Sequence, residues 1–287
     1  MATLKEIKKR INSIKNTRKT TSAMKMVSSS KLRKAENTIS NMLPYSEALY
    51  HVMESLLTGD YSGTLIQERP VNRIALVAFS SDSSLCGAFN SNISRELLKA
   101  IEKYKSSIPD ENIQVYTIGK KVYDNVRKTG VTITQNFENL AGKADYSTIA
   151  EFAGSLITQF EKEQVDRVEL IYHHFKSAGT QLLVNTPLLP VILPTQNDQE
   201  NQNGTTDYIL EPSREELLKT LIPKGIKLQL YTALLDSNAS EHAARMIAMQ
   251  TATDNADDLV NELTIEYNKS RQQAITNELL DLASGSA

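Results

Sequence analysis

Long stretches without helix-breaking residues occupy both ends of the chain. Residues 226–284 contain neither glycine nor proline, so nothing in this stretch interrupts an α-helix. Gly285 follows the last apolar turn, at a position where many helices end on glycine. The pattern predicts one very long helix or two nearly collinear ones. Its beginning is less defined, because the alternating residues 227–231 also fit a short strand before a cap at Asp236 or Ser240.

A helix of this length does not fit inside a globule made from the same chain. At about 1.5 Å per residue it extends roughly 65–90 Å. A compact chain of 287 residues has a diameter of only about 50 Å. The helix must therefore project from the rest of the chain or pair with a segment that covers its apolar positions.

The first 58 residues have the pattern of such a partner. They contain one proline, Pro44, and no glycine, and Thr3 with Glu6 forms a T-x-x-E capping box at their start. Apolar residues then recur with the three- and four-residue spacing of a coiled coil. These residues are Leu4, Ile7, Ile11, Ile14, Leu32, Ala35, Ile39, Met42, Leu49, Met53 and Leu56.

Polar residues interrupt this apolar series in its middle. The same spacing falls there on Arg18, Thr21, Lys25 and Ser28. Because such side chains weaken an apolar seam, we expect a small shift in phase that brings Met24 and Val27 into the helix–helix contact.

The two ends of the chain carry opposite charge. Residues 1–34 hold eleven Lys and Arg against one acid, and residues 236–287 hold three Lys and Arg against nine acids. Opposite fields on two long amphipathic helices favour their pairing with each other over self-pairing. Since one helix enters the middle of the chain and the other leaves it, the sequence predicts a long antiparallel coiled coil. A charged helical hairpin without a further role is the alternative.

The middle of the chain alternates between strand-like and helix-like segments. Predicted strands are 73–79, 113–118, 131–137 and 167–175, with an added antiparallel strand at 180–184 before Pro187. Predicted helices are 90–104, 120–128, 146–160 and 215–221. The order predicts an α/β fold with a Rossmann-like βαβ domain and a mainly parallel five-stranded sheet. The domains are then an N-terminal coiled-coil helix (1–58), an α/β globular foot (70–222) and a C-terminal coiled-coil helix (226–287).

Composition narrows the class of protein. A net charge of −2 with 23% charged residues is ordinary for a soluble intracellular chain. The single cysteine, Cys86, excludes an internal disulfide. No apolar run approaches the roughly 20 residues that cross a bilayer, so we expect any membrane link to go through another protein.

One cysteine and two adjacent histidines are candidates for nucleophilic chemistry. Cys86 follows the first predicted strand, where α/β domains often bind ligands. A nucleophilic cysteine needs a nearby base, and His173 and His174 lie near the end of the fourth strand. Adjacent residues on a strand face opposite sides, so only one of the two histidines can join such a site. An enzyme built on these residues is the second hypothesis for function.

Other chemistry has weaker support in the sequence. There is no GxGxxG or GxxxxGK[ST] motif and no metal-ligand spacing of His, Cys, Asp or Glu. We therefore expect no cofactor and no metal held by this chain. Nucleic-acid binding by the basic residues 1–34 is the third hypothesis. It is disfavoured because the cations are spread out, few aromatic residues accompany them, and an acidic helix opposes them.

Several segments together resemble one protein family. The run SEHAARMIAMQTATDN closely resembles the γ subunits of F-type ATP synthases, and further matching segments are 14–17, 23–27, 30–34, 44–45, 80–90, 267–272 and 275–279. The matches cover both ends and the middle in the same order. The resemblance implies a non-catalytic central-stalk rotor. Such a subunit couples proton-driven rotation of the membrane c ring to ATP synthesis or hydrolysis at the α/β catalytic sites.

The resemblance also implies contact residues. Positions matching contacts with a loop of β are Arg271, Gln272, Thr276 and Glu278, with Arg245 as a further polar contact. Positions matching the part that faces the acidic C-terminal loop of β are Met24, Lys25, Arg33 and Lys34. Tyr208 resembles a residue of the segment near ε and the c ring. Ser83 and Ser84 stand where the family usually has an Arg-Gly pair, so no role is carried over to that loop.

The implied partners are three α and three β subunits, the ε subunit and the c-subunit ring, with no nucleic acid. Membrane contact is expected through these partners only. The chain lacks the cysteine-bearing regulatory insertion of the chloroplast proteins, which favours a bacterial enzyme. The implied location is therefore peripheral, on the cytoplasmic side of the bacterial inner membrane.

Overall fold

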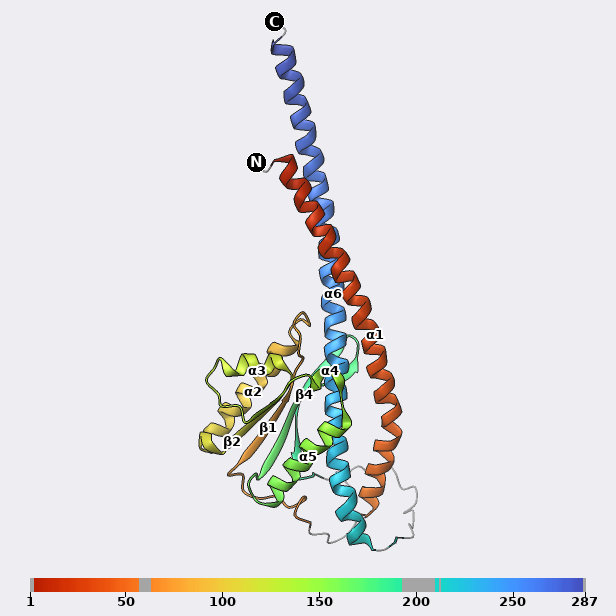
Figure 1. Ribbon diagram of the computed structural model, residues 1–287, viewed down its shortest axis with the longest axis vertical. Coiled ribbons are helices and arrows are strands. Elements are labelled where there is room, and N and C mark those ends of the chain that lie inside the picture. Colours follow the sequence, from red (N-terminus) through yellow and green to blue (C-terminus); the bar gives the residue numbers. More distant parts are fainter. Residues whose placement is uncertain (1–2, 57–62, 193–209, 212, 286–287) are drawn as a thin grey trace, which may run out of the picture. The chain divides into compact units, whose positions relative to one another are not determined.

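The protein combines two long helices with an α/β domain. The computed structural model describes residues 3–56, 63–192, 210–211 and 213–285. It divides into two compact units, one made of Met1–Ser30 with Arg245–Ala287 and the other of Lys31–Ala244. In chain order the elements are α1 (Leu4–Leu56), β1 (Ile74–Phe79), α2 (Phe89–Lys105), a 3₁₀ turn (Asp110–Asn112), β2 (Ile113–Ile118), α3 (Lys120–Arg127), β3 (Gln135–Phe137), α4 (Leu140–Lys143), α5 (Tyr146–Glu161), β4 (Arg167–Ser177), β5 (Thr180–Leu189) and α6 (Arg214–Gly285) (Figure 1).

A five-stranded sheet forms the centre of the unit Lys31–Ala244. Its strand order is β3-β2-β1-β4-β5. The pairs β1–β2, β1–β4 and β2–β3 are parallel, and β4–β5 is antiparallel. The predicted fold class, a mainly parallel five-stranded sheet accompanied by long terminal helices, is confirmed.

Helices cover both faces of this sheet. Along β1, Ile74, Leu76 and Ala78 pack towards α2 and α3. The alternate residues Ala75, Val77 and Phe79 pack towards α5 and towards the parts of α1 and α6 in this unit. Figure 1 shows α2 and α3 on one side of the strands and α5, α1 and α6 on the other. Burial on both faces explains why β1 is apolar at every position.

Two strands differ from their predicted lengths by more than two residues. β3 spans only Gln135–Phe137 rather than 131–137, and β5 continues past Pro187 to Leu189. Proline has no backbone N–H to donate to a neighbouring strand. Pro187 is tolerated because β5 is the edge strand of the sheet, where a backbone nitrogen on the open side needs no hydrogen bond to another strand. A register shift in β4, between Val168 and Glu169, accompanies this part of the pairing.

The start of α6 also differs from its prediction. The expected separate helix 215–221, the alternative strand 227–231 and the caps at Asp236 or Ser240 are all replaced by one helix that begins at Arg214. Ser213 caps it, since its Oγ accepts a hydrogen bond from the Glu216 N–H at 3.3 Å. The helix continues through Pro223 because a buried stripe on both sides packs into the core; the stripe is Leu218, Ile222, Ile226 and Leu230.

In the unit made of Met1–Ser30 and Arg245–Ala287, α1 and α6 pair as antiparallel helices. Ile7 and Ile11 form an apolar cluster with Leu263. Further along, Arg18 lies 2.6 Å from Asp257, and the Thr21 hydroxyl lies 2.8 Å from that of Thr253. Residue numbers rise along α1 as they fall along α6, as an antiparallel pair requires.

The capping box at the start of α1 is confirmed. The Thr3 N–H donates to Glu6 Oε2 at 2.8 Å, and the Glu6 N–H donates to Thr3 Oγ1 at 3.3 Å. These two hydrogen bonds lower the pKa of the Glu6 carboxyl from its ordinary value.

The predicted phase shift in the middle of the seam is wrong. Thr21 and Ser28 stay buried in the original register, whereas Val27 is 56% exposed. No shift is needed because the buried hydroxyls are satisfied. Thr21 bonds to Thr253, and Ser28 Oγ donates to the Met24 carbonyl at 2.8 Å.

Apolar burial, rather than charge pairing, should hold this helix pair together. We expect Ile7→Ala to destabilise the pairing by about 2–3 kcal/mol, because it leaves a cavity against Leu263. Arg18→Ala should cost less than about 1 kcal/mol, since its ion pair with Asp257 is nearly half exposed. Hydrogen exchange of amides in residues 4–21 measures both variants. Equal loss of protection in the two would contradict this expectation.

Candidate partner-binding surface

The last turns of α6 expose a series of apolar side chains. Leu279 and Leu280 are each 62% exposed and Leu282 is 71% exposed, and Ile265 and Ile275 are exposed as well. Large exposed apolar side chains that recur along one helix segment in this way favour a contact site for another molecule. In the sequence, these leucines indicate only where the helix ends. They recur beyond Tyr267, which packs against the apolar cluster between α1 and α6. This recurrence of apolar residues was the signal for a contact with another molecule.

Four of the predicted contact residues lie along the same segment. Arg271, Gln272, Thr276 and Glu278 are all exposed. The Thr276 hydroxyl donates to the Gln272 carbonyl of its own helix at 2.9 Å. The end of α6 thus offers polar groups beside apolar ones, which is the composition of a protein-binding surface.

The other predicted contact residues differ in accessibility. Arg33 and Lys34 are exposed, and Met24 and Lys25 are partly exposed. Arg245 is buried, at 8% exposed. Tyr208 lies outside the described residues. All of these positions remain predictions.

The loop after β1 holds Cys86 in a closed hydrogen-bonded cluster. The thiol is only 1% exposed. The amide of Asn90 donates to its sulfur at 3.1 Å and to Ser81 Oγ at 2.8 Å. Ser81 Oγ in turn donates to the Ser83 carbonyl at 2.6 Å. A nucleophile must reach its substrate, so the burial of this thiol argues against the enzyme hypothesis.

The two adjacent histidines face opposite sides of the sheet, as predicted. His173 stacks on Phe89 of α2, with ring centroids 4.5 Å apart. His174 Nδ1 lies 2.6 Å from Asp236 Oδ2 of α6. Burial raises the pKa of Asp236, and the hydrogen bond and charge of His174 oppose that rise. The pair ties β4 to α6, and Ser240 adds a hydrogen bond from α6 to the His173 carbonyl at 3.1 Å.

The stack of His173 on Phe89 lies just past the carboxyl end of β1, near the position where an open α/β sheet would bind a ligand. That position lies beyond the carboxyl ends of β1 and β4, where the strand order reverses. Burial lowers the pKa of His173 to about 4, so its ring stays neutral at pH 7 and serves as packing. The arrangement suits a structural scaffold.

This histidine makes folding sensitive to acid. Its pKa in the folded chain, about 4, lies below its ordinary value of 6.5. Between these two values the unfolded chain binds the proton more readily, so stability falls as pH drops from about 6.5 to 4. We expect a total loss of roughly 3 kcal/mol from this residue. Urea unfolding at several pH values measures it.

His173→Phe keeps an aromatic ring against Phe89 and removes the titratable imidazole. The free energy of unfolding of this variant should therefore depend less on pH between 4 and 6.5. His51→Gln, at an exposed position on α1, is the matched control and should leave the dependence intact. Identical pH profiles for the original chain and the His173→Phe variant would refute the assignment.

Neither a membrane span nor a metal centre is found in the described part of the chain. Among the described helices, none combines the length and the hydropathy needed to cross a bilayer. Among the same residues, no group of three or more His, Cys, Asp or Glu side chains is arranged to hold a metal ion.

Comparison with known sequences gives one consistent match. A family model described as ATP synthase matches residues 3–287. An ATP synthase gamma chain of Bacteroides fragilis is 50% identical over 289 residues, covering 100% of this chain and 99% of the relative. An ATP synthase gamma chain of Flavobacterium psychrophilum is 42% identical, covering 99% and 98%.

Solved structures give the same result. The central stalk and c-ring structure of Tetrahymena thermophila mitochondrial ATP synthase contains a chain 26% identical to this one, with a TM-score of 0.62. The match covers 81% of this chain and 98% of that chain. A rotor chain of Euglena gracilis mitochondrial ATP synthase shares the fold at 18% identity, with a TM-score of 0.66 and coverage of 95% and 98%.

Proposed function

Because this chain belongs to the ATP synthase gamma chain family, we propose that it is the rotor subunit of the central stalk. In this role it couples proton-driven rotation of the membrane c ring to ATP synthesis or hydrolysis at the catalytic sites of α and β. The chain itself is non-catalytic. It transmits torque through two paired helices.

The observation that carries this proposal is the uncovered end of α6. Leu279, Leu280 and Leu282 are largely exposed, so water contacts an apolar surface that a partner would cover. A surrounding ring of three α and three β subunits supplies such a cover. The neighbouring polar side chains keep the contact from being uniformly apolar, which lowers the desolvation cost when the helix turns against its partners.

Two sets of polar residues are proposed to meet the β subunits. Arg271, Gln272, Thr276 and Glu278, together with Arg245, contact a loop of β. Met24, Lys25, Arg33 and Lys34 face the acidic C-terminal loop of β, where opposite charge attracts. The α/β domain, with Tyr208, joins the ε subunit and the c ring.

These partners also provide the link to the membrane. The chain is proposed to be a peripheral membrane protein on the cytoplasmic side of the bacterial inner membrane. The bacterial origin of its relatives supports this location.

Reconstitution of ATP hydrolysis tests the function. The isolated chain should not hydrolyse ATP, whereas its addition to α and β should raise hydrolysis by at least about tenfold, an effect expected when a missing part of the catalytic cycle is restored. ATP hydrolysis by the chain alone would favour the enzyme hypothesis. Full activity of α and β without the chain would remove the proposed role.

A further inference from the structure

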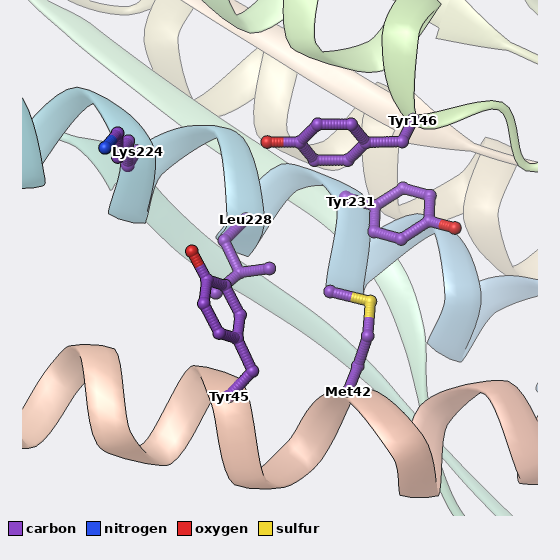
Figure 2. Close-up of a pocket in the computed structure, with 6 residues that line it drawn as sticks. All are labelled: Met42, Tyr45, Tyr146, Lys224, Leu228 and Tyr231. Atoms are coloured by element: carbon purple, nitrogen blue, oxygen red, sulfur yellow. The ribbon is translucent and has the colours of Figure 1, made fainter.

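An open crevice lies between α1, α5 and α6 in the unit Lys31–Ala244. Its volume is about 410 Å³, within the range of sites that hold small molecules. Figure 2 shows the six side chains that line it, which are Met42, Tyr45, Tyr146, Lys224, Leu228 and Tyr231. None of them belongs to the contact residues proposed above.

Aromatic rings and apolar groups form most of this crevice. Tyr146 and Tyr231 pack edge to face, with ring centroids 5.3 Å apart, and Leu228, which also lines the crevice, is buried. Tyr45 and Tyr146 are exposed, so their rings present faces that a flat ligand can cover. Such faces favour another aromatic ring over an aliphatic chain.

One end of the crevice is polar and positively charged. Lys224 lies there, and Figure 2 shows the hydroxyls of Tyr45 and Tyr146 directed towards that end and the hydroxyl of Tyr231 directed away. Within the described residues, Lys224 forms no ion pair with a carboxylate. A lysine at the same end of the crevice as two phenolic donors suits a carboxylate or a similar anion.

We propose that this crevice binds a planar aromatic anion, with its ring against Tyr45 and Tyr146 and its carboxylate beside Lys224. The division of the crevice into an aromatic end and a cationic end fixes the orientation of the ligand. A neutral aromatic compound would fill the same space without the contact to Lys224, and an aliphatic acid would lack the ring contacts.

Titration with naphthalene-2-carboxylate tests the proposal on the full chain. Backbone amide NMR shifts should move saturably at residues 42–45, 146 and 224–231, with a dissociation constant on the order of 0.1 mM for a ligand of this size. The neutral analogue naphthalene-2-carboxamide should bind about fivefold more weakly, because it lacks the charge. Shifts confined to other segments, or no saturable binding up to about 1 mM, would overturn the proposal.

Variants at exposed positions separate the two ends of the crevice. Lys224→Gln should weaken the binding of naphthalene-2-carboxylate about fivefold and leave the binding of naphthalene-2-carboxamide unchanged. Tyr45→Ala should weaken the binding of both compounds about tenfold. Lys219→Gln on α6 and Tyr50→Ala on α1 are matched controls outside the crevice and should change neither. If Lys224→Gln and Lys219→Gln bind the acid equally well, the carboxylate does not lie at Lys224 and the assignment is wrong.

Discussion

Replacing Gly119 with alanine is expected to unfold the α/β domain under conditions where the original chain is stable. Gly119 connects β2 to α3 with φ of +96°, a conformation that side chains rarely adopt. An added Cβ would overlap the carbonyl oxygen of Ser80 and lie 2.8 Å from its carbonyl carbon. Ser80 cannot retreat, because its N–H donates to the Ile118 carbonyl at 2.7 Å. We expect a loss of at least about 4 kcal/mol, from backbone strain and overpacking together.

Chemical unfolding monitored by circular dichroism measures this loss. Gly154→Ala is the matched control, because nothing lies within 4 Å of its added Cβ and its place inside α5 favours alanine by up to about 1 kcal/mol. The two substitutions should therefore act in opposite directions. A Gly119→Ala chain as stable as the original would show that the close approach of Ser80 is not maintained.

Removal of the Glu169 carboxylate is the second change with a large expected effect. This side chain is 5% exposed and accepts three hydrogen bonds. The donors are Tyr104 Oη at 2.6 Å, Arg167 Nε at 2.9 Å and Asn185 Nδ2 at 3.1 Å. Glu169→Ala leaves these groups without their acceptor, which costs roughly 3–5 kcal/mol for a buried charged network.

The tyrosine in this network gives an independent measurement. Burial, followed by the hydrogen bond and the charge of Glu169, raises the pKa of Tyr104 to about 12. Glu169→Gln removes the charge and keeps an acceptor, so the pKa of Tyr104 should fall while most of the stability is retained. NMR titration of the Tyr104 ring measures this pKa. An unchanged pKa in Glu169→Gln would mean that burial alone sets the value.

Much of the α/β domain follows from local sequence. β1, β2 and β4 begin within one residue of their predicted positions. β1 is apolar and buried at every position, as expected for a strand covered on both faces. β2 and β4 also contain polar residues, and it is their β-branched and aromatic residues that mark them as strands. β5 was underestimated because a proline normally ends a strand. Its position at the sheet edge, which makes Pro187 acceptable, depends on tertiary pairing that sequence pattern does not contain.

The long helices were predicted in kind and partly missed in detail. The helical spacing of the apolar residues located α1, and the T-x-x-E motif located its cap. Thr21 and Ser28, however, were expected to be replaced in the helix–helix contact by Met24 and Val27, whereas the structure buries both. Each hydroxyl finds an acceptor carbonyl within α1 itself, Thr21 at Arg18 and Ser28 at Met24, and Thr21 also meets Thr253 of α6. The spacing of polar residues along the sequence does not distinguish such satisfied, buried hydroxyls from exposed ones. The same holds for Pro223, which α6 tolerates because the core packs on both sides of it.

Contact residues were the least accessible to sequence reasoning. Exposure of Arg271 and Glu278 is compatible with partner binding, but any solvated helix face would expose them as well. The largely solvent-exposed Leu279, Leu280 and Leu282 near the end of α6 distinguish this surface from an ordinary polar helix face.

Observation of rotation tests the central claim most directly. In a Cys86→Ser background, a cysteine at the exposed position Lys128 carries a bead, and the complex with α and β is fixed to a surface. With ATP, we predict that the bead turns continuously in one direction and stops when ATP is removed. ATP hydrolysis at full rate beneath a stationary, firmly attached bead would contradict the proposal that this chain is the rotor.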